Sequence, residues 1–573
     1  MLLESLSTIG KNFLWAFIIY LALRGMGYAL TRIVKKDIPG WIHPILGVAL
    51  FTGIGGWLDL WHLATMPNLT LLALIGLGGT GLEAYDRWKS KNWEFQTSYL
   101  WLLIPIVLSI YPTFPDLLCF DDNNGYFPVC NEMTVSGTSW APLSLRRALT
   151  FGGQFPLQTL GMLFTQDRGG WLYDNLVATF IFAGLSIQLI KKNRAPTGIL
   201  AACVLPLLPQ ACINSAPGQL VTLLLLGAVC LKEPNFQTLL LGAALTLRTQ
   251  SIVFIAALLA WDLFQPNWKT AIQRPLYKIL GIFLFCLPFA LNSWEQFKTP
   301  SPLVLPGTID PAYLHLTSPL AETLLALKTT GIEILAPITI LVISLFEKSL
   351  RRAGTASLLS LAAITYATTE LSKDYWIRYS WPFLSVGLIA AIFFWASDRK
   401  TQAPWVILLS FSCLTVPFIR IASGWEKIPE RLTYIDGFSG ENYRMQLQIP
   451  EKTGIACIIK RTANLDFRRN KILNLDVFPA IGALPKTTDP QKWREWGKSH
   501  AVDYLVHMDF DYKESKQGQS FKESLANPPV SEPHYHKVWI PNRLQTIQTL
   551  EALRKTLPYK QFEGYYIFDL RTP

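Results

Sequence analysis

Three carboxylates lie close together in the segment YPTFPDLLCFDDNNGYFPV, which covers residues 111–129 and directly follows an apolar stretch. They are Asp116, Asp121 and Asp122. A partly desolvated carboxylate beside a membrane-embedded cavity can act as a general base, taking a proton from an acceptor hydroxyl or amide while a lipid phosphate leaves. A solvated turn is the alternative, because DDNNG is rich in turn-forming residues.

Two arginines have the chemistry to bind a phosphate group. Arg378 is followed by Tyr379 in DYWIRYSWPFL, and Arg248 interrupts the apolar run LTLRTQS. A guanidinium can bind phosphate oxygens in bidentate fashion. An arginine inside an apolar stretch needs an anionic partner more than one at a membrane boundary does. The alternatives are an interfacial anchor for Arg378 and a pairing with a neighbouring helix for Arg248.

Two cysteines flank the acidic residues. In an oxidising compartment, Cys119 and Cys130 could form a disulfide that closes a short loop around Asp121 and Asp122, and two separate thiols are the alternative. His534 and His536 form an HxH pair without a cysteine or carboxylate at ligand spacing. We therefore assign no metal ligands.

The elements that must position these residues are apolar blocks. Half of the 573 residues are hydrophobic and only 16% are charged, and nothing at the N-terminus resembles a cleavable signal peptide. This composition predicts an α-helical polytopic membrane protein with about 12–14 transmembrane helices. The spans are expected near residues 12–31, 41–62, 69–85, 98–114, 171–190, 197–213, 217–231, 235–247, 250–264, 277–294, 330–346, 354–371, 379–397 and 404–421.

Lys and Arg residues gather in alternate connections between these blocks, which predicts that those connections are cytoplasmic. Both termini and the loops 115–170 and 296–329 should then lie outside. The acidic segment, Arg248 and Arg378 fall on this outer side. The net charge of +11 is therefore explained by membrane topology, and we expect no nucleic-acid partner. Two segments within residues 144–167 are predicted either to lie flat on the membrane or to pack as a loop on the bundle.

A transmembrane domain is expected over residues 1–424 and a small soluble α/β domain, on the extracytoplasmic side, over 425–573, where the composition becomes polar. Asp489 and Pro490 predict the start of a helix at QKWREWGKSH, and LQTIQTLEALRKTL predicts a second one. A Ser499, His500 and Asp503 triad is not indicated. Strands are expected at residues 454–461, 472–478, 503–508 and 565–570.

Three stretches together resemble motifs of the C-type glycosyltransferases, which are polytopic membrane enzymes. They are FDDNNGYFPV, LGAALTLRTQSIVF and IRYSWPFL. The resemblance implies an inverting transfer, with Asp121 or Asp122 as the base or acceptor-positioning group and Asp116 as third choice. It implies that Arg378, with Tyr379 beside it, and Arg248 hold the carrier phosphate. Some members use a divalent ion at the acidic loop. In this chain four spans precede that loop, whereas the family usually has one.

The sequence thus predicts a glycosyltransferase of the plasma (inner) membrane and the cell envelope. It would move a sugar from a polyprenyl-phosphate carrier in the membrane to an extracytoplasmic glycolipid, glycan or protein. The alternatives are a non-catalytic scaffold subunit and a lipid-linked glycan transporter or polymerase. The sugar and the acceptor are not predicted.

Overall fold

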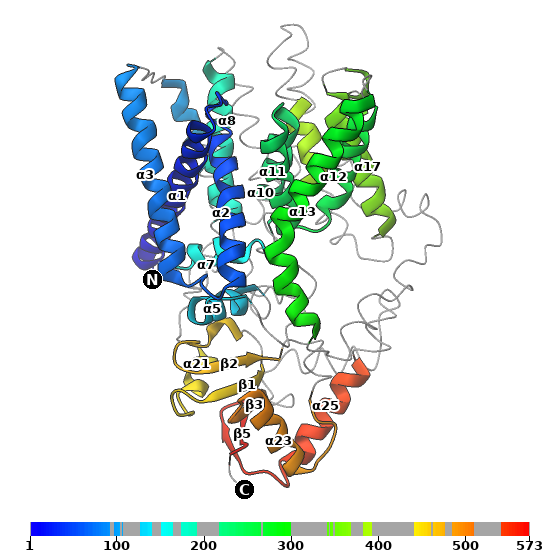
Figure 1. The fold of residues 1–573 in the computed structure, drawn as a ribbon. Coiled ribbons are helices and arrows are strands. Elements are labelled where there is room, and N and C mark those ends of the chain that lie inside the picture. The colour runs from blue at the N-terminus through cyan, green and yellow to red at the C-terminus, as the bar shows by residue number, and fades with distance from the viewer. Residues whose placement is uncertain are drawn as a thin grey trace. The chain divides into compact units, whose positions relative to one another are not determined.

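The computed structural model is mostly helical, with one five-stranded sheet near the C-terminus (Figure 1). The structure describes residues 2–91, 97–103, 106, 126–139, 151–163, 173–191, 217–264, 268–298, 338, 341–342, 344–347, 350–367, 382–391, 440–459, 462–475, 484–508 and 540–571.

The chain divides into two compact units. The first, which is helical, comprises residues 1–119, 150–291 and 318–435, and the second comprises 120–149, 292–317 and 436–573. The main elements of the helical unit are α1 (Leu2–Ile33), α2 (His43–Leu60), α3 (Met66–Lys89), η1 (Thr97–Leu102), α7 (Phe155–Gly161), η5 (Tyr173–Val177), α8 (Ala178–Lys191), α10 (Gln219–Cys230), α11 (Pro234–Leu247), α12 (Ser251–Leu263), α13 (Trp268–Lys298, which runs past the boundary of the unit) and α17 (Arg351–Ala367).

Glycines allow α1, α2 and α3 to pack backbone against backbone. A Cβ atom on Gly25 would lie 1.9 Å from the carbonyl oxygen of Gly76, and one on Gly47 would lie 1.7 Å from that of Leu23. Between membrane helices, close packing of this kind replaces the hydrophobic effect as the source of attraction. The small residues therefore determine which helix faces meet.

Two described helical segments are long and apolar enough to cross a membrane, Gly10–Ile33 and Ala271–Ser293. The second presents exposed apolar side chains at helical spacing, including Leu276, Leu280 and Phe283, and α3 does the same with Leu71 and Ile75. Apolar faces this large mark contact with a membrane or with another protein. These features suggest a membrane location.

The charged ends of α1 and α3 meet the start of α2. Arg24 donates two hydrogen bonds to Glu83, of 2.8 and 2.6 Å, and Arg87 forms an ion pair of 2.8 Å with the same carboxylate. Glu83 is buried, so these two partners offset the cost of removing its charge from water. Arg24, which interrupts the first apolar block, thus pairs across 59 residues of sequence. These helix ends belong to connections that the charge pattern places on one side.

Helix α7 favours packing on the helix bundle over a flat position on the membrane surface for residues 155–161. Every residue of Phe155–Gly161 is buried, and Trp15 donates a 3.0 Å hydrogen bond from its indole to the carbonyl oxygen of Leu160. Gly153 also donates a 3.1 Å backbone hydrogen bond to Thr246 at the end of α11. The described residues 151–163 thus pack on the helix bundle, whereas most of the first predicted segment lies outside the described residues.

The sheet of the second unit has the order β2-β1-β3-β5-β4. β2, β1 and β3 are parallel, whereas β5 and β4 run antiparallel to their neighbours. The elements of this unit are α5 (Phe127–Ser136), α21 (Glu441–Gln446), β1 (Gly454–Ile458), η9 (Thr462–Asn464), β2 (Lys471–Asn474), α23 (Pro490–His500), β3 (Tyr504–Met508), α25 (Ile540–Leu553), β4 (Tyr559–Phe562) and β5 (Tyr565–Asp569).

Both faces of the sheet are buried. Trp493 and Trp496 of α23 join Leu550 and Leu553 of α25 in the core on one face. Met445 of α21 belongs to a second core on the other face, together with Ile455, Val506 and other alternate strand residues. Because successive strand residues point to opposite faces, the two cores share the same strands. The predicted small α/β region is thus a three-layer arrangement.

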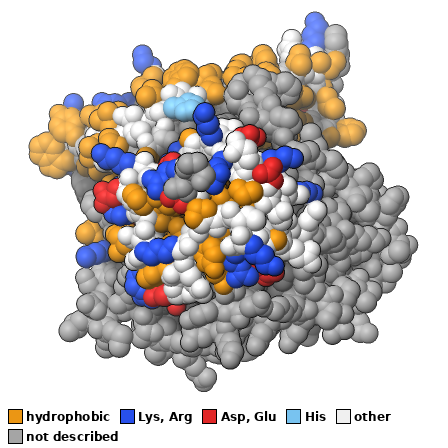
Figure 2. Space-filling model, turned by 90° about the horizontal axis from the view of Figure 1, so that it is seen from below, with side chains coloured by type: hydrophobic (Ala, Val, Ile, Leu, Met, Phe, Trp, Pro, Cys, Tyr) orange, Lys and Arg blue, Asp and Glu red, His pale blue; other side chains and the backbone are white. Residues whose placement is uncertain are grey.

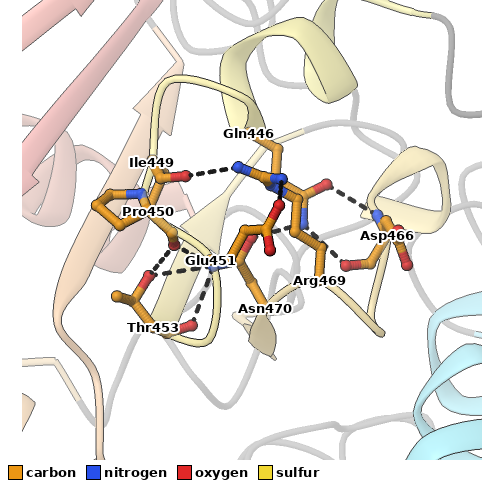
Figure 3. Close-up of polar contacts among 8 residues, drawn as sticks. All are labelled: Gln446, Ile449, Pro450, Glu451, Thr453, Asp466, Arg469 and Asn470. Carbon is orange, nitrogen blue, oxygen red and sulfur yellow. Dashed lines mark hydrogen bonds and ion pairs between the residues drawn. The ribbon is translucent and has the colours of Figure 1, made fainter.

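A polar network fixes the chain around the start of β1 (Figure 3). Asn470 donates from its amide to the carbonyl oxygens of Pro450, at 2.8 Å, and Thr453, at 3.3 Å. Gln446 donates to the Asp466 carbonyl oxygen at 2.9 Å and accepts from the Asp466 amide at 2.8 Å. Arg469 pairs with Glu451. These bonds satisfy buried polar groups in two loops that contain no sheet bonds of their own.

The exposed surface of this region is charged. Figure 2, which views the molecule from the end where Figure 1 draws the sheet, shows basic and acidic side chains interspersed with apolar ones. Arg444 and Glu563 form an exposed ion pair of 3.3 Å. Surface charges of mixed sign are typical of a domain in water.

Candidate functional site

Most of the site residues proposed from the sequence lie outside the described residues. These are Asp116, Asp121, Asp122, Cys119, Arg378 and Tyr379. Arg248 and Cys130 are described, as are the segments that follow the acidic loop and Arg378. Arg248 and the segment that follows Arg378 belong to the helical unit, and the segment that follows the acidic loop belongs to the sheet-containing unit.

Helix α5 begins six residues after Asp121 and belongs to the same unit as the sheet. Pro128 stands in its first turn, and Gly137 ends it in the left-handed region with φ 75°. Phe127 and Met133 are fully buried, and the helix packs against η9 of the sheet region. Cys130 is buried in this helix. The chain that leaves the acidic loop is thus held by the C-terminal part of the protein.

Glu132 on α5 lies close enough to Lys471 at the start of β2 for their charges to interact. Burial raises the pKa of the Glu132 carboxyl, and the positive charge of Lys471 lowers it by a smaller amount. The contact between α5 and the sheet region therefore contains one partly desolvated charge pair.

Arg248 lies in the tight turn that joins α11 to α12. Its backbone is extended, with φ −150° and ψ 110°, and its amide donates a 2.9 Å bond to the Ala244 carbonyl oxygen. Its own carbonyl oxygen accepts from the amide of Ser251 at 3.0 Å. The side chain is buried, with an exposed fraction of 7%. A buried guanidinium at the end of a helical hairpin requires anionic or carbonyl partners.

One carboxylate that the sequence did not single out lies near Arg248. Asp174, in the π-helix η5, accepts backbone hydrogen bonds from Gly218 at 2.9 Å, Gln219 at 3.2 Å and Leu220 at 2.9 Å. It caps the N-terminus of α10, where its negative charge also complements the helix dipole. The charges of Asp174 and Arg248 interact.

A sequence signal for this cap exists but is incomplete. Helix α10 starts at SAPGQL, and Gly218 at its cap position has no side chain to accept from the free amides. The missing cap indicates that a distant group must supply the acceptor. It does not say that the group is Asp174, 44 residues earlier in the chain.

The segment after Arg378 and Tyr379 reaches the same end of the helical unit. Pro382 accepts a 3.3 Å hydrogen bond from the Thr222 hydroxyl in the first turn of α10. Phe383 stacks on Phe254 in the first turn of α12, with ring centroids 6.2 Å apart. The chain four residues beyond Arg378 thus lies beside the helix ends that Asp174 and Arg248 occupy.

Among the residues that the structure describes, no three His, Cys, Asp or Glu side chains are grouped as metal ligands. In the C-terminal region, Ser499 and His500 are 2.9 Å apart between Oγ and Nδ1. Asp503, however, accepts from the Gly454 amide at 2.8 Å. These contacts give no support for a hydrolytic triad.

No family model and no curated protein sequence matches the chain. Solved structures of an Archaeoglobus fulgidus oligosaccharyltransferase do. One, in complex with Zn and sulfate, is 11% identical, with 82% of this chain and 73% of that chain covered and a TM-score of 0.42. Another, of the oligosaccharyltransferase AglB with an inhibitory peptide and a dolichol-phosphate, is 10% identical, with 83% and 75% covered and a TM-score of 0.39.

The chain therefore resembles solved oligosaccharyltransferase structures, in line with the likeness to C-type glycosyltransferases that its motifs suggest. With identities near one in ten and TM-scores below 0.5, these structures assign no role to any residue of this chain.

Proposed function

We propose that the chain is a multi-pass membrane glycosyltransferase. It transfers a sugar from a polyprenyl-phosphate carrier to an acceptor on the extracytoplasmic side. The likeness to oligosaccharyltransferases favours glycosyl or oligosaccharyl transfer as the class of reaction. The polyprenyl-phosphate donor and the extracytoplasmic acceptor are parts of this proposal.

The observation that carries it is the convergence at one end of the helical unit. Arg248 lies in the turn that directly precedes α12, and the helix that follows Arg378 contacts the first turns of α10 and α12. The contacts of Pro382 and Phe383, which follow Arg378 in the chain, support a common location for two arginines that are 130 positions apart in sequence. Two guanidinium groups close to each other can bind the oxygens of one phosphate group. This favours binding of a phosphate carrier over separate roles as membrane anchors.

In the proposed reaction, the acceptor attacks the anomeric carbon of the sugar, and a new glycosidic bond forms there. The bond from that carbon to the phosphate oxygen breaks, and its electron pair stays on the departing polyprenyl phosphate. Asp121 or Asp122 takes the acceptor proton, with Asp116 as the remaining candidate. Arg378 and Arg248, with Tyr379 beside the former, offset the charge that develops on the phosphate. One displacement inverts the anomeric configuration.

A divalent ion at the acidic loop is a further part of the proposal, since a neighbouring structure contains Zn. Carboxylates are ligands for such ions. Turnover measured after chelation, and again after addition of Mg²⁺, Mn²⁺ or Zn²⁺, tests this separately.

The test uses purified full-length protein with a panel of polyprenyl-phosphate sugars and acceptors. Asp121→Asn, Asp122→Asn and the double variant are compared with Glu495→Gln, an exposed carboxylate on α23. Loss of a general base is expected to lower turnover by about 10²–10⁴-fold, whereas Glu495→Gln keeps parental turnover.

The arginines are tested in the same assay. Arg378→Gln and Arg248→Gln should each lower kcat/KM by about 10–100-fold, as expected for a lost charge-assisted hydrogen bond. Arg351→Gln, an exposed arginine outside the proposed site, is the control. Parental turnover in all of these aspartate variants contradicts the base role of Asp121 and Asp122. No turnover of the parent with any donor contradicts the enzyme and favours the scaffold or transporter alternative.

A further inference from the structure

A buried ion cluster joins α12, α13 and α17, apart from the Arg248 region. Lys278 and Asp262 form an ion pair of 2.5 Å, and their side chains are 3% and 9% exposed. Arg352 approaches the same carboxylate, with 3.6 Å between its Nη2 atom and Oδ1 of Asp262. The three residues come from helix ends that the charge pattern places together on the cytoplasmic side.

Positive charge exceeds negative charge in this cluster. Asp262 is the one acidic group that interacts with Lys278 and Arg352 among the charges recorded for either, whereas Arg274 repels both. Arg274 is exposed and stands one turn before Lys278 on α13. Two cations thus pair with one carboxylate and a third lies close enough to repel them, and burial makes an uncompensated charge costly.

The guanidinium of Arg352 also has unused hydrogen-bonding capacity. At 3.6 Å its contact with Asp262 is longer than a hydrogen bond. Its Nε atom is buried without a hydrogen-bond partner within the described part of the chain. The neighbouring Arg351 differs, because its Nε donates a 2.8 Å bond to the Leu345 carbonyl oxygen.

The surroundings of the cluster are apolar and exposed. Leu263 and Phe264 end α12, and Leu276 stands between Arg274 and Lys278 on α13; their exposed fractions are 54%, 84% and 63%. A ligand with an anionic head and apolar chains could contact both kinds of surface.

We propose that Arg352 and Arg274 bind a negatively charged phosphate group at this cluster. The exposed apolar side chains favour a phospholipid as its source, with free phosphate as the other source of the same chemistry. The site is distinct from the proposed transferase site and does not depend on it.

The test is binding of phosphatidylglycerol to purified full-length protein, followed by native mass spectrometry and by the shift in Tm. Phosphatidylcholine and inorganic phosphate are titrated in parallel. Phosphatidylglycerol is expected to bind the parent, and Arg352→Gln and Arg274→Gln should each weaken the apparent affinity by about tenfold or more. Arg351→Gln, the matched neighbour, should bind like the parent.

If Arg352→Gln does not fold, Arg274→Gln still tests the proposal. Arg274 is exposed and takes no part in the ion pairs with Asp262, so its replacement should leave the fold intact. An equal, Arg274-dependent stabilisation by inorganic phosphate identifies free phosphate as the source. Equal binding of phosphatidylcholine, parental affinity in Arg274→Gln, or no binding of either phosphate ligand overturns the proposal.

Discussion

The helical unit and the sheet-containing unit distribute charged and apolar side chains in opposite ways. In the helical unit, Glu83, Asp262 and Lys278 are buried, while large apolar side chains cover the outer faces of α3 and α13. In the second unit, the described large apolar side chains that remain exposed are Val135, Leu447 and Tyr559. Two of its described ion pairs, Arg444 with Glu563 and Arg571 with Asp569, lie on the surface.

This difference indicates that the two units fold against different surroundings. A sheet with two apolar cores is stabilised by removing apolar surface from water. Helices with apolar outer faces gain little in this way inside a membrane, so close backbone contact and buried polar bonds must hold them together. Substitutions that increase side-chain volume should therefore harm the helical unit most, and substitutions that remove volume should harm the sheet region most.

The largest expected effect comes from Gly47→Leu. Its Cβ would lie 1.7 Å from the Leu23 carbonyl oxygen. A backbone atom cannot relieve this clash by a change of rotamer, as a side chain could. We expect α1 and α2 to separate, at a cost of about 3 kcal/mol or more, with loss of the monodisperse peak in size-exclusion chromatography.

Gly78→Leu is the control for this variant, because nothing lies within 4 Å of a Cβ at this position of α3. The same side chain is thus added to a helix of the same unit without a close contact. If both variants elute like the parent, backbone contact does not hold the helical unit together.

The second effect comes from Trp493→Ala in the sheet region. Trp493 is fully buried, and its indole donates a 2.8 Å bond to the Thr487 carbonyl oxygen. Removing it should lower the free energy of unfolding by about 3–5 kcal/mol, measured as earlier proteolysis of the C-terminal region in the full chain. Trp88→Ala, on the outside of α3 with 70% exposure, should leave the proteolysis pattern unchanged. Equal sensitivity of the two variants contradicts the comparison.

The local patterns of the sequence predicted much of what the structure has. Asp489 caps α23 by accepting from the Gln491 amide at 2.9 Å, as its position before Pro490 predicts. The four predicted strands correspond to β1, β2, β3 and β5, but the exposed edge strand β4 was missed. Its residues YKQF lack the apolar alternation that marked the other strands. Three of these four residues are exposed, so this edge strand does not need an apolar face.

The contacts between distant residues could not be predicted. Arg24 and Glu83 read as isolated charges in two apolar blocks, and only their packing shows that each satisfies the other. The cap on α10 by Asp174 has the same character. The proposed catalytic residues Asp121 and Asp122 remain predictions, since they lie outside the described residues.

The smallest effect concerns Glu132, a carboxylate of the second unit that is partly buried, whereas the ion pairs Arg444–Glu563 and Arg571–Asp569 of this unit lie on the surface. Burial raises its pKa above the usual 4.5, so the folded protein binds this proton more tightly than the unfolded chain. The contribution of this carboxyl to stability should therefore be greatest below pH 4.5 and fall as the pH rises through the raised pKa. Glu132→Gln removes this penalty, so its Tm at neutral pH should exceed that of the parent.

Lys471→Gln provides the opposite change at the same contact. It removes the positive charge that lowers the pKa of Glu132, so the ionised carboxylate becomes costlier in the folded state. The Tm of this variant should lie below that of the parent at neutral pH and approach it below pH 4.5. Thermal unfolding of the full chain between pH 4 and 7.5 measures both. A lower Tm for Glu132→Gln at neutral pH would mean that the carboxylate stabilises α5 on the sheet region, as an ion pair in water would.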